Sequence, residues 1–184
     1  MSYTVFDKEL ALIANNEVRS TVEAILVLAP DQFWYMPASS SGKYHAADEC
    51  LPCGNVLHTK RVVAMVRMLA PAYGVAGVEL DYCMAAALIH DILKGGAAEG
   101  DLKFTAKCSR AEYERHGPNL LLWYQDVLGF IAWPADAILD IASRHMGVWS
   151  PVGYQPDDKL SQLVAMADYV ASRKPLAPAI PLAE

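Results

Sequence analysis

The sequence has no excess of basic residues. Its 184 residues include 15 Lys and Arg against 21 Asp and Glu, which gives a formal net charge of −6. A surface with this charge lacks the broad positive field that non-specific binding to long nucleic acid requires. We therefore expect no long nucleic acid as a partner, whereas a small nucleotide remains compatible with the composition.

Long hydrophobic runs are also missing. The most apolar stretch, residues 82–93, contains His90 and Asp91 and is shorter than the roughly 20 residues that a membrane-spanning helix needs. Charged residues at positions 7–9 occupy the place of the apolar segment of a signal sequence. We expect a cytoplasmic protein without a membrane partner. The hydrophobic fraction of 54% predicts one domain over residues 1–184 with a single buried core.

The chain is poor in cysteine and in nucleophile motifs. A Gly-x-Ser-x-Gly elbow, a phosphate loop and a dinucleotide fingerprint are all absent. Cys50 and Cys53 have the spacing of a redox dithiol or of half a zinc site. Cys83 and Cys108 form no second pair, however, and no strand pattern precedes Cys50. We interpret Cys50 and Cys53 as reduced loop cysteines.

Apolar residues recur at three- and four-residue spacing, and strict alternation is scarce, which predicts an all-α fold of about six or seven helices. Asp81 and Ser109 are candidate N-caps, and Gly117-Pro118 is expected to break one helix. The expected helices cover residues 7–28, 55–69, 81–94, 110–128, 134–145 and 159–173, and a proline-rich tail follows at residues 174–184.

Four of the five histidines lie at or beside expected helix ends: His58, His90, His116 and His145. Asp91 directly follows one of them, and Asp168 lies in an otherwise apolar helix. A carboxylate buried in such a helix needs a compensating charge, which a divalent cation supplies. Imidazole and carboxylate together suit iron, manganese, cobalt or zinc. The pattern therefore predicts a metal site inside the helical bundle.

The order of these residues resembles the HD superfamily of metal-dependent phosphohydrolases. Residues 87–94 match its apolar-His-Asp-Ile-x-Lys signature, and residues 166–169 match its closing Ala-Asp motif. The resemblance spans about residues 43–173 and implies a first metal site with Asp91 in the bridging position. The implied ligands are His58, His90, Asp91 and Asp168.

Two further segments, residues 116–118 and 144–147, are similar to the additional histidine motifs of binuclear HD proteins, such as HD-GYP phosphodiesterases and HD-type diadenosine tetraphosphate hydrolases. This similarity implies that His116 and His145 bind a second metal. The implied cofactor is two divalent ions per chain, Fe or Mn first, with Co, Ni, Zn and Mg also compatible. The chain departs from the family at Cys53-Gly54, which replaces paired glycines, and at Leu93, which replaces a glycine.

Several residues are candidates for substrate binding. Lys94 lies one helical turn beyond His90, where its ammonium is able to hold a phosphate oxygen, although a solvated helix-end lysine is the alternative. The segment 39–45 resembles the approach to the first ligand in HD-type 3′–5′ exoribonucleases. The remaining candidates, for which a plain surface role is equally compatible, are Lys43, His45, Arg110, Arg115 and Arg144.

The predicted function is hydrolysis of a phosphoester or phosphoanhydride bond in a small nucleotide-like substrate by metal-activated hydroxide, with Asp91 and Lys94 as catalytic residues. Three alternatives stay open: an HD-type di-iron oxygenase, a 3′–5′ exoribonuclease, and a non-catalytic protein that binds metal or nucleotide. The sequence also leaves open whether the chain forms a homo-oligomer.

Overall fold

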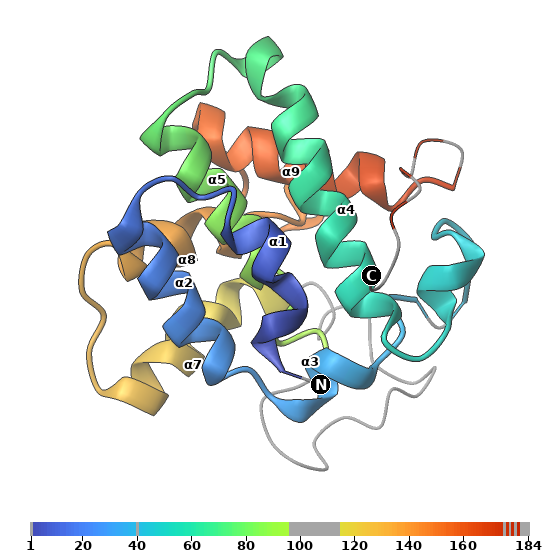
Figure 1. Ribbon diagram of the computed structural model, residues 1–184, viewed down its shortest axis with the longest axis horizontal. Helices are drawn as coiled ribbons and strands as arrows, with labels where there is room; N and C mark the ends of the chain where they lie inside the picture. Colours follow the sequence, from blue (N-terminus) through green and yellow to red (C-terminus); the bar gives the residue numbers. More distant parts are fainter. Residues whose placement is uncertain are drawn as a thin grey trace.

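The computed structural model describes residues 2–39, 41–95, 115–174, 176, 178 and 180. Within these residues every regular element is a helix, which confirms the all-α prediction (Figure 1). The α-helices are α1 (Asp7–Leu10), α2 (Asn16–Val27), α3 (Asp31–Tyr35), α4 (Gly54–Leu69), α5 (Val78–Ile89), α7 (His116–Leu128), α8 (Ala135–Ser143) and α9 (Lys159–Ala171). Short 3₁₀ helices are η1 (Tyr3–Phe6), η2 (Ala47–Cys50), η3 (Ala70–Tyr73) and η4 (Gly147–Trp149).

The single helix predicted for residues 7–28 is wrong, because residues 11–15 separate α1 from α2. The side chain of Asn15 caps α2. The backbone N–H groups of Ala14 and Asn15 donate to the two carboxylate oxygens of Asp81, at 3.0 and 2.8 Å. Asp81 therefore does not cap its own helix as predicted, but supplies the acceptors that hold this break in place.

The break expected at Gly117-Pro118 in the 110–128 helix falls in the first turn of α7, and residues 110–114 before it lie outside the described residues. α7 begins at His116 in the described part of the chain and runs on through both residues. A proline in the first helical turn is tolerated there because its missing N–H would have no intrahelical partner. The predicted Ser109 cap and helix residues 110–114 lie outside the described residues. At α9, Asp158 caps the helix in a capping box with Ser161.

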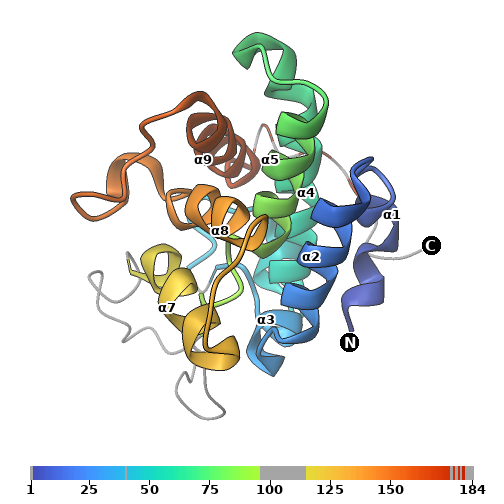
Figure 2. The same cartoon turned by 90° about the vertical axis from the view of Figure 1, so that its left-hand side faces the viewer.

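Helix α5 occupies the centre of the bundle. It packs against α4, and in Figure 2 it lies between α2 on one side and α8 and α9 on the other. All its residues from Cys83 to Ile89 are buried, since the helix is apolar around its whole circumference. Its C-terminal end therefore delivers His90 and Asp91 to the interior, where four other helices converge.

One hydrophobic cluster extends from Phe6 in η1 to Ala171 at the end of α9. This core surrounds the end of α5 and keeps the polar groups there away from solvent. Among the helices described, none has the length and hydropathy needed to cross a bilayer.

Candidate metal centre

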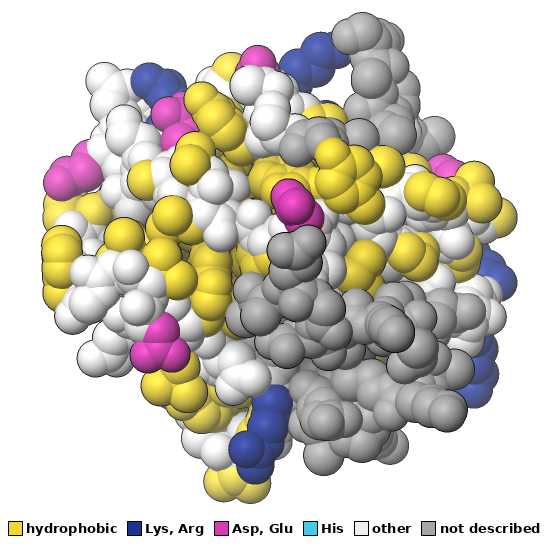
Figure 3. Space-filling view, turned by 90° about the horizontal axis from the view of Figure 1, so that it is seen from below, with side chains coloured by type: hydrophobic (Ala, Val, Ile, Leu, Met, Phe, Trp, Pro, Cys, Tyr) yellow, Lys and Arg dark blue, Asp and Glu magenta, His cyan; other side chains and the backbone are white. Residues whose placement is uncertain are grey.

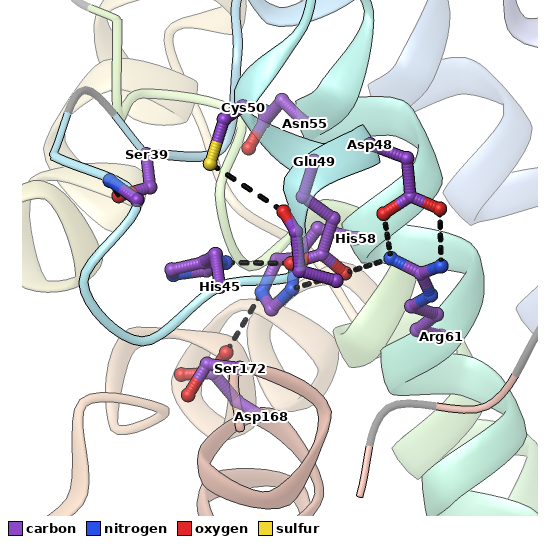
Figure 4. Close-up of polar contacts among 12 residues, drawn as sticks. Ser39, His45, Asp48, Glu49, Cys50, Asn55, His58, Arg61, Asp168 and Ser172 are labelled. Carbon is purple, nitrogen blue, oxygen red and sulfur yellow. Dashed lines mark hydrogen bonds and ion pairs between the residues drawn. The ribbon is translucent and has the colours of Figure 1, made fainter. Parts of the chain in front are cut away.

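The first group of candidate ligands joins α4, the end of α5 and α9. Nε2 of His58 lies 2.9 Å from Oδ1 of Asp168, and Nε2 of His90 lies 3.8 Å from the same oxygen. One donor atom from each of the three residues lies within 4.8 Å of the others. Figure 4 shows His58 pointing toward Asp168 across the space between α4 and α9. This geometry is suitable for a divalent cation.

The second group joins the turn after α5 with α7 and α8. Oδ1 of Asp91 lies 3.0 Å from Nε2 of His116 and 3.6 Å from Nε2 of His145. The two histidine Nε2 atoms are 2.9 Å apart. All three side chains are buried, and their donor atoms again lie within 4.8 Å of one another. The residues implied by the resemblance for a second metal therefore meet in space.

Asp91 lies between the two groups. Its Oδ2 atom, which points away from the second group, is 3.4 Å from Nε2 of His90 and 3.9 Å from Nε2 of His58. The same oxygen accepts a 2.7 Å hydrogen bond from Nζ of Lys94. The carboxylate thus has one oxygen toward each group, as the bridging position implied by the resemblance requires.

Hydrogen bonds to backbone carbonyls set the tautomers of two histidines. Nδ1 of His90 lies 2.7 Å from the Ala87 carbonyl, and Nδ1 of His145 lies 2.7 Å from the Ala142 carbonyl. A carbonyl only accepts, so each Nδ1 carries the hydrogen and each neutral ring presents an Nε2 lone pair to the cluster. Nε2 of His90 is buried and has no hydrogen-bond partner among the described residues. A metal ion would satisfy it, so these residues fit a metal site.

The electrostatics of the site agree with that fit. Burial, together with His116 and His90, lowers the pKa of His145 to about 3, so the ring is neutral near pH 7. Burial opposes ionisation of Asp91, but Lys94 and His90 hold its pKa well below the usual range. The His58 hydrogen bond likewise outweighs burial and lowers the pKa of Asp168. The site therefore combines ionised carboxylates with the neutral ring of His145. Burial opposes the charge of His58, but Asp168 and Glu49 raise its pKa to about 9, so this ring must release its proton when a metal binds.

Glu49 is a buried residue of the site that sequence reasoning missed. One of its oxygens lies 2.7 Å from Nδ1 of His45, and the other lies 2.8 Å from Nη1 of Arg61 and 3.7 Å from Nδ1 of His58 (Figure 4). Burial alone would raise the pKa of Glu49, but the two imidazoles and the guanidinium lower it below its usual range. An ionised carboxylate therefore stands behind the ring of His58, on the side away from Asp168. No local pattern distinguishes Glu49 from the solvated acids of a polar loop.

The turn into α4 explains the departure from paired glycines. Cys53 has a φ of 64°, in the left-handed region that favours glycine. A Cβ added at Gly54 would overlap the backbone carbonyl of Glu49. The glycine at position 54 thus permits the contact that places Glu49 beside His58, whereas position 53 accepts a cysteine at the cost of backbone strain.

The cysteines of the described residues are free thiols. Cys50 donates from Sγ to the Ala46 carbonyl at 3.4 Å. The candidate metal-binding groups found in the described part contain histidine, aspartate and glutamate. Burial raises the pKa of Cys83 to about 12, which keeps this thiol protonated. Cys108 lies outside the described residues.

A cavity of about 1210 Å³ opens over the metal centre, and Asp91, Asp168 and His145 form part of its wall. Two of the predicted substrate-binding residues, Lys94 and His45, also line it. Lys43, Arg115 and Arg144 are not among the described lining residues, and their contacts with substrate stay predictions.

Arg144 forms ion pairs with two carboxylates. Its guanidinium pairs with Asp140 at 3.2 Å and with Asp157 at 3.1 Å. Lys43 and Arg115 are exposed. Arg110 lies outside the described residues.

In Figure 3, no histidine is visible on the coloured part of the face shown, in line with the burial of the site.

A family model described as HD domain matches residues 56–173, which is more than half of the chain. Neither the search of curated proteins nor the search of solved structures found a match. The matched segment contains all six candidate ligands, whereas Glu49 and His45 precede it.

Proposed function

The chain belongs to the HD-domain family, and on this basis we propose that it is a metal-dependent phosphohydrolase acting on a small nucleotide-like substrate. The observation that carries the proposal is the position of Asp91, whose two oxygens face two separate groups of candidate ligands at the wall of one cavity. A pair of divalent cations held in this way is the arrangement used to hydrolyse phosphate esters.

In this proposal His58, His90 and Asp168 hold one ion, and His116 and His145 hold the other, with Asp91 shared. When bound, such ions lower the pKa of a water molecule and neutralise charge on phosphoryl oxygens. Iron and manganese suit the mixed imidazole and carboxylate donors best. The backbone carbonyls that accept from Nδ1 of His90 and of His145 leave the Nε2 lone pairs of both rings available to ions that these residues would hold.

Lys94 supplies positive charge from the protein itself. Its ammonium lies 2.7 Å from Oδ2 of Asp91 and lines the cavity, so it stands beside the place where the phosphoryl group would lie. An ammonium has three donors and is able to serve Asp91 and a phosphoryl oxygen together. The ion pair with Asp91 also holds the lysine in position before substrate arrives, which lowers the cost of ordering it.

The decisive experiment begins with metal analysis of protein purified without chelator. It continues with a screen of nucleotides and generic phosphodiesters in added Mn²⁺ or Fe²⁺, in which released phosphate and oxygen uptake are both recorded. We expect phosphate release without oxygen uptake. Asp91→Ala should abolish the release, and Asp126→Ala, a change of an exposed carboxylate on α7, should preserve it.

Two results would contradict the proposal. Full hydrolytic activity of the Asp91→Ala variant would show that this site does not carry out the reaction. Oxygen uptake by the iron-loaded protein without hydrolysis would favour the di-iron oxygenase, because the family members with that activity use the same six-residue ligand set.

A further inference from the structure

An aromatic rim with one guanidinium borders the cavity. We use this name for Tyr44, Trp149, Tyr169 and Arg173, all of which line it. Cζ of Arg173 lies 4.5 Å from the ring centroid of Tyr44 and 4.1 Å from that of Tyr169. The ring of Tyr169 in turn stacks on Trp149, with centroids 5.9 Å apart and an interplanar angle of 16°.

Backbone contacts hold the rim together. Tyr169 lies in the last turn of α9 and Arg173 two residues beyond the end of this helix, and the backbone N–H of Arg173 donates to the Val170 carbonyl at 3.0 Å. The backbone N–H of Lys174 donates to the Tyr44 carbonyl at 2.9 Å, which joins the loop before α4 to the segment after α9. Arg173 is therefore placed against Tyr44 by main-chain geometry as well as by stacking.

The charge of Arg173 has no carboxylate partner in the described part of the chain. The other cation of the cavity wall, Lys94, pairs with Asp91. Arg61 and Arg144 each pair with carboxylates. In a protein with more acidic than basic residues, a guanidinium that faces a cavity and lacks such a partner is available to an incoming anion. Its Nε is buried and has no hydrogen-bond partner among the described residues.

The stacking defines what kind of anion fits. The rings of Tyr44 and Tyr169 flank the guanidinium of Arg173, stabilise its positive charge and fix its plane. Two parallel N–H donors in one plane match the paired oxygens of a phosphate or a carboxylate. A cavity of about 1210 Å³ also has room for more than the group at the metal centre.

We propose that Arg173 binds a second oxyanion of the substrate, a phosphate or carboxylate separate from the phosphoryl group at Asp91. The identity of the reacting group rests on the proposed function, but the anion site does not. Arg173 adds to the substrate-binding residues predicted from the sequence. The substrate class is accordingly a small molecule with two anionic groups.

The test uses metal-free protein, so that no bound metal ion is present to attract the anion. Inorganic phosphate, succinate and adenosine are titrated by calorimetry into the chelator-treated wild type and into Arg173→Met, Arg173→Lys and Lys94→Met. Arg67→Met, which removes an exposed guanidinium of α4, is the matched control. Thermal unfolding of each variant verifies that it is folded.

We expect phosphate or succinate to bind the wild type and Arg67→Met alike. Arg173→Met should weaken that binding by about tenfold or more, and Arg173→Lys should weaken it less. Preference for phosphate or for succinate identifies the oxyanion. Equal affinity in Arg173→Met, or a loss confined to Lys94→Met, would overturn the proposal. Binding of adenosine with no binding of either anion would overturn it too, because the rim would then be a stacking platform for a base.

Activity gives an independent readout. With a substrate from the nucleotide screen, Arg173→Met should raise KM while kcat changes little, and hydrolysis of bis(p-nitrophenyl) phosphate, which has one anionic group, should be unaffected. If no substrate is hydrolysed by any variant while phosphate still binds through Arg173, the proposed function fails and the anion site stands.

Discussion

Asp91 and His116 are separated by 25 residues in the sequence, yet Oδ1 of Asp91 lies 3.0 Å from Nε2 of His116. The other oxygen of the same carboxylate faces His90 at 3.4 Å. One carboxylate therefore connects two groups of imidazoles that come from different helices. The number of metal ions the protein binds depends on this connection, and it is open to direct measurement.

The number of metal ions bound per chain should distinguish the roles of the two groups of candidate ligands. Wild type should bind two ions per chain, and His116→Ala or His145→Ala should retain one ion and lose most turnover, because hydrolysis needs both. Asp91→Ala should weaken binding at both positions. Equilibrium dialysis with Mn²⁺ or Fe²⁺, with Asp126→Ala as the control, gives the counts. One ion per wild-type chain at saturation, together with fully active His116 and His145 variants, would refute a binuclear site.

Glu49 should influence metal affinity without touching the metal. Replacement by glutamine removes the negative charge behind His58 and beside Arg61, so Glu49→Gln should lower metal affinity about 10- to 100-fold. The matched control is Asp48→Asn, which removes the other carboxylate partner of Arg61 and leaves His58 untouched. Competition against a chelator of known affinity measures both variants. Equal losses in the two would show that Glu49 acts only through Arg61.

The metal-free protein should be most stable near pH 6.5. Burial opposes the charge of His58, but Asp168 and Glu49 outweigh it and raise its pKa from 6.5 to about 9. The folded state thus holds this proton more tightly than the unfolded state, and the stabilisation, at most roughly 3 kcal/mol, is lost as the pH rises from 6.5 to about 9. The lowered pKa of His145, about 3, has the opposite effect on stability. As the pH falls below 6.5 the unfolded chain takes up a proton at this imidazole and the folded protein does not, so the folded protein loses stability on acidification.

Urea denaturation of chelator-treated protein across this range measures the effect. His58→Gln should remove the alkaline loss and leave most of the acid loss. Added metal should reduce the alkaline loss in wild type, because a bound imidazole has already given up its proton. A wild-type midpoint that does not change between pH 6.5 and pH 9 would contradict the assignment.

The turn before α4 offers a matched pair of substitutions. Cys53→Gly should stabilise the protein by about 1 kcal/mol, because glycine adopts the left-handed conformation without strain. Gly54→Ala should destabilise it and weaken metal binding, because the added methyl group displaces the Glu49 backbone. Thermal unfolding and metal titration of both variants provide the test. A neutral Gly54→Ala would mean that the contact with Glu49 is dispensable.

The sequence by itself determined the elements whose signals are local. The helices at residues 54–69 and 159–171 lie close to their predicted bounds, because apolar periodicity and caps such as Asp158 act within a few residues. The family resemblance, carried by short motifs around His90 and Asp168, is likewise confirmed. These features depend on neighbours along the chain and can be read from it.

Other features depend on contacts between segments that are distant in the sequence, and only the tertiary structure determines these features. The break before α2 depends on Asp81, which is more than sixty residues away. Glu49 is buried because Arg61, His45 and His58 surround it, although its local sequence is that of a solvated loop. Burial of a charge is set by the groups that compensate it, and these belong to the packed molecule.

The arginines show the same limit. Arg144, next to a candidate ligand, was one of several candidates for an anion in the sequence, and Asp140 and Asp157 pair with it in the structure. Arg173 carried no such signal, and packing placed it between Tyr44 and Tyr169 at the cavity wall. All guanidiniums are chemically alike, so the availability of one for a ligand depends on which carboxylates the fold brings near it, and this is a property of the tertiary structure.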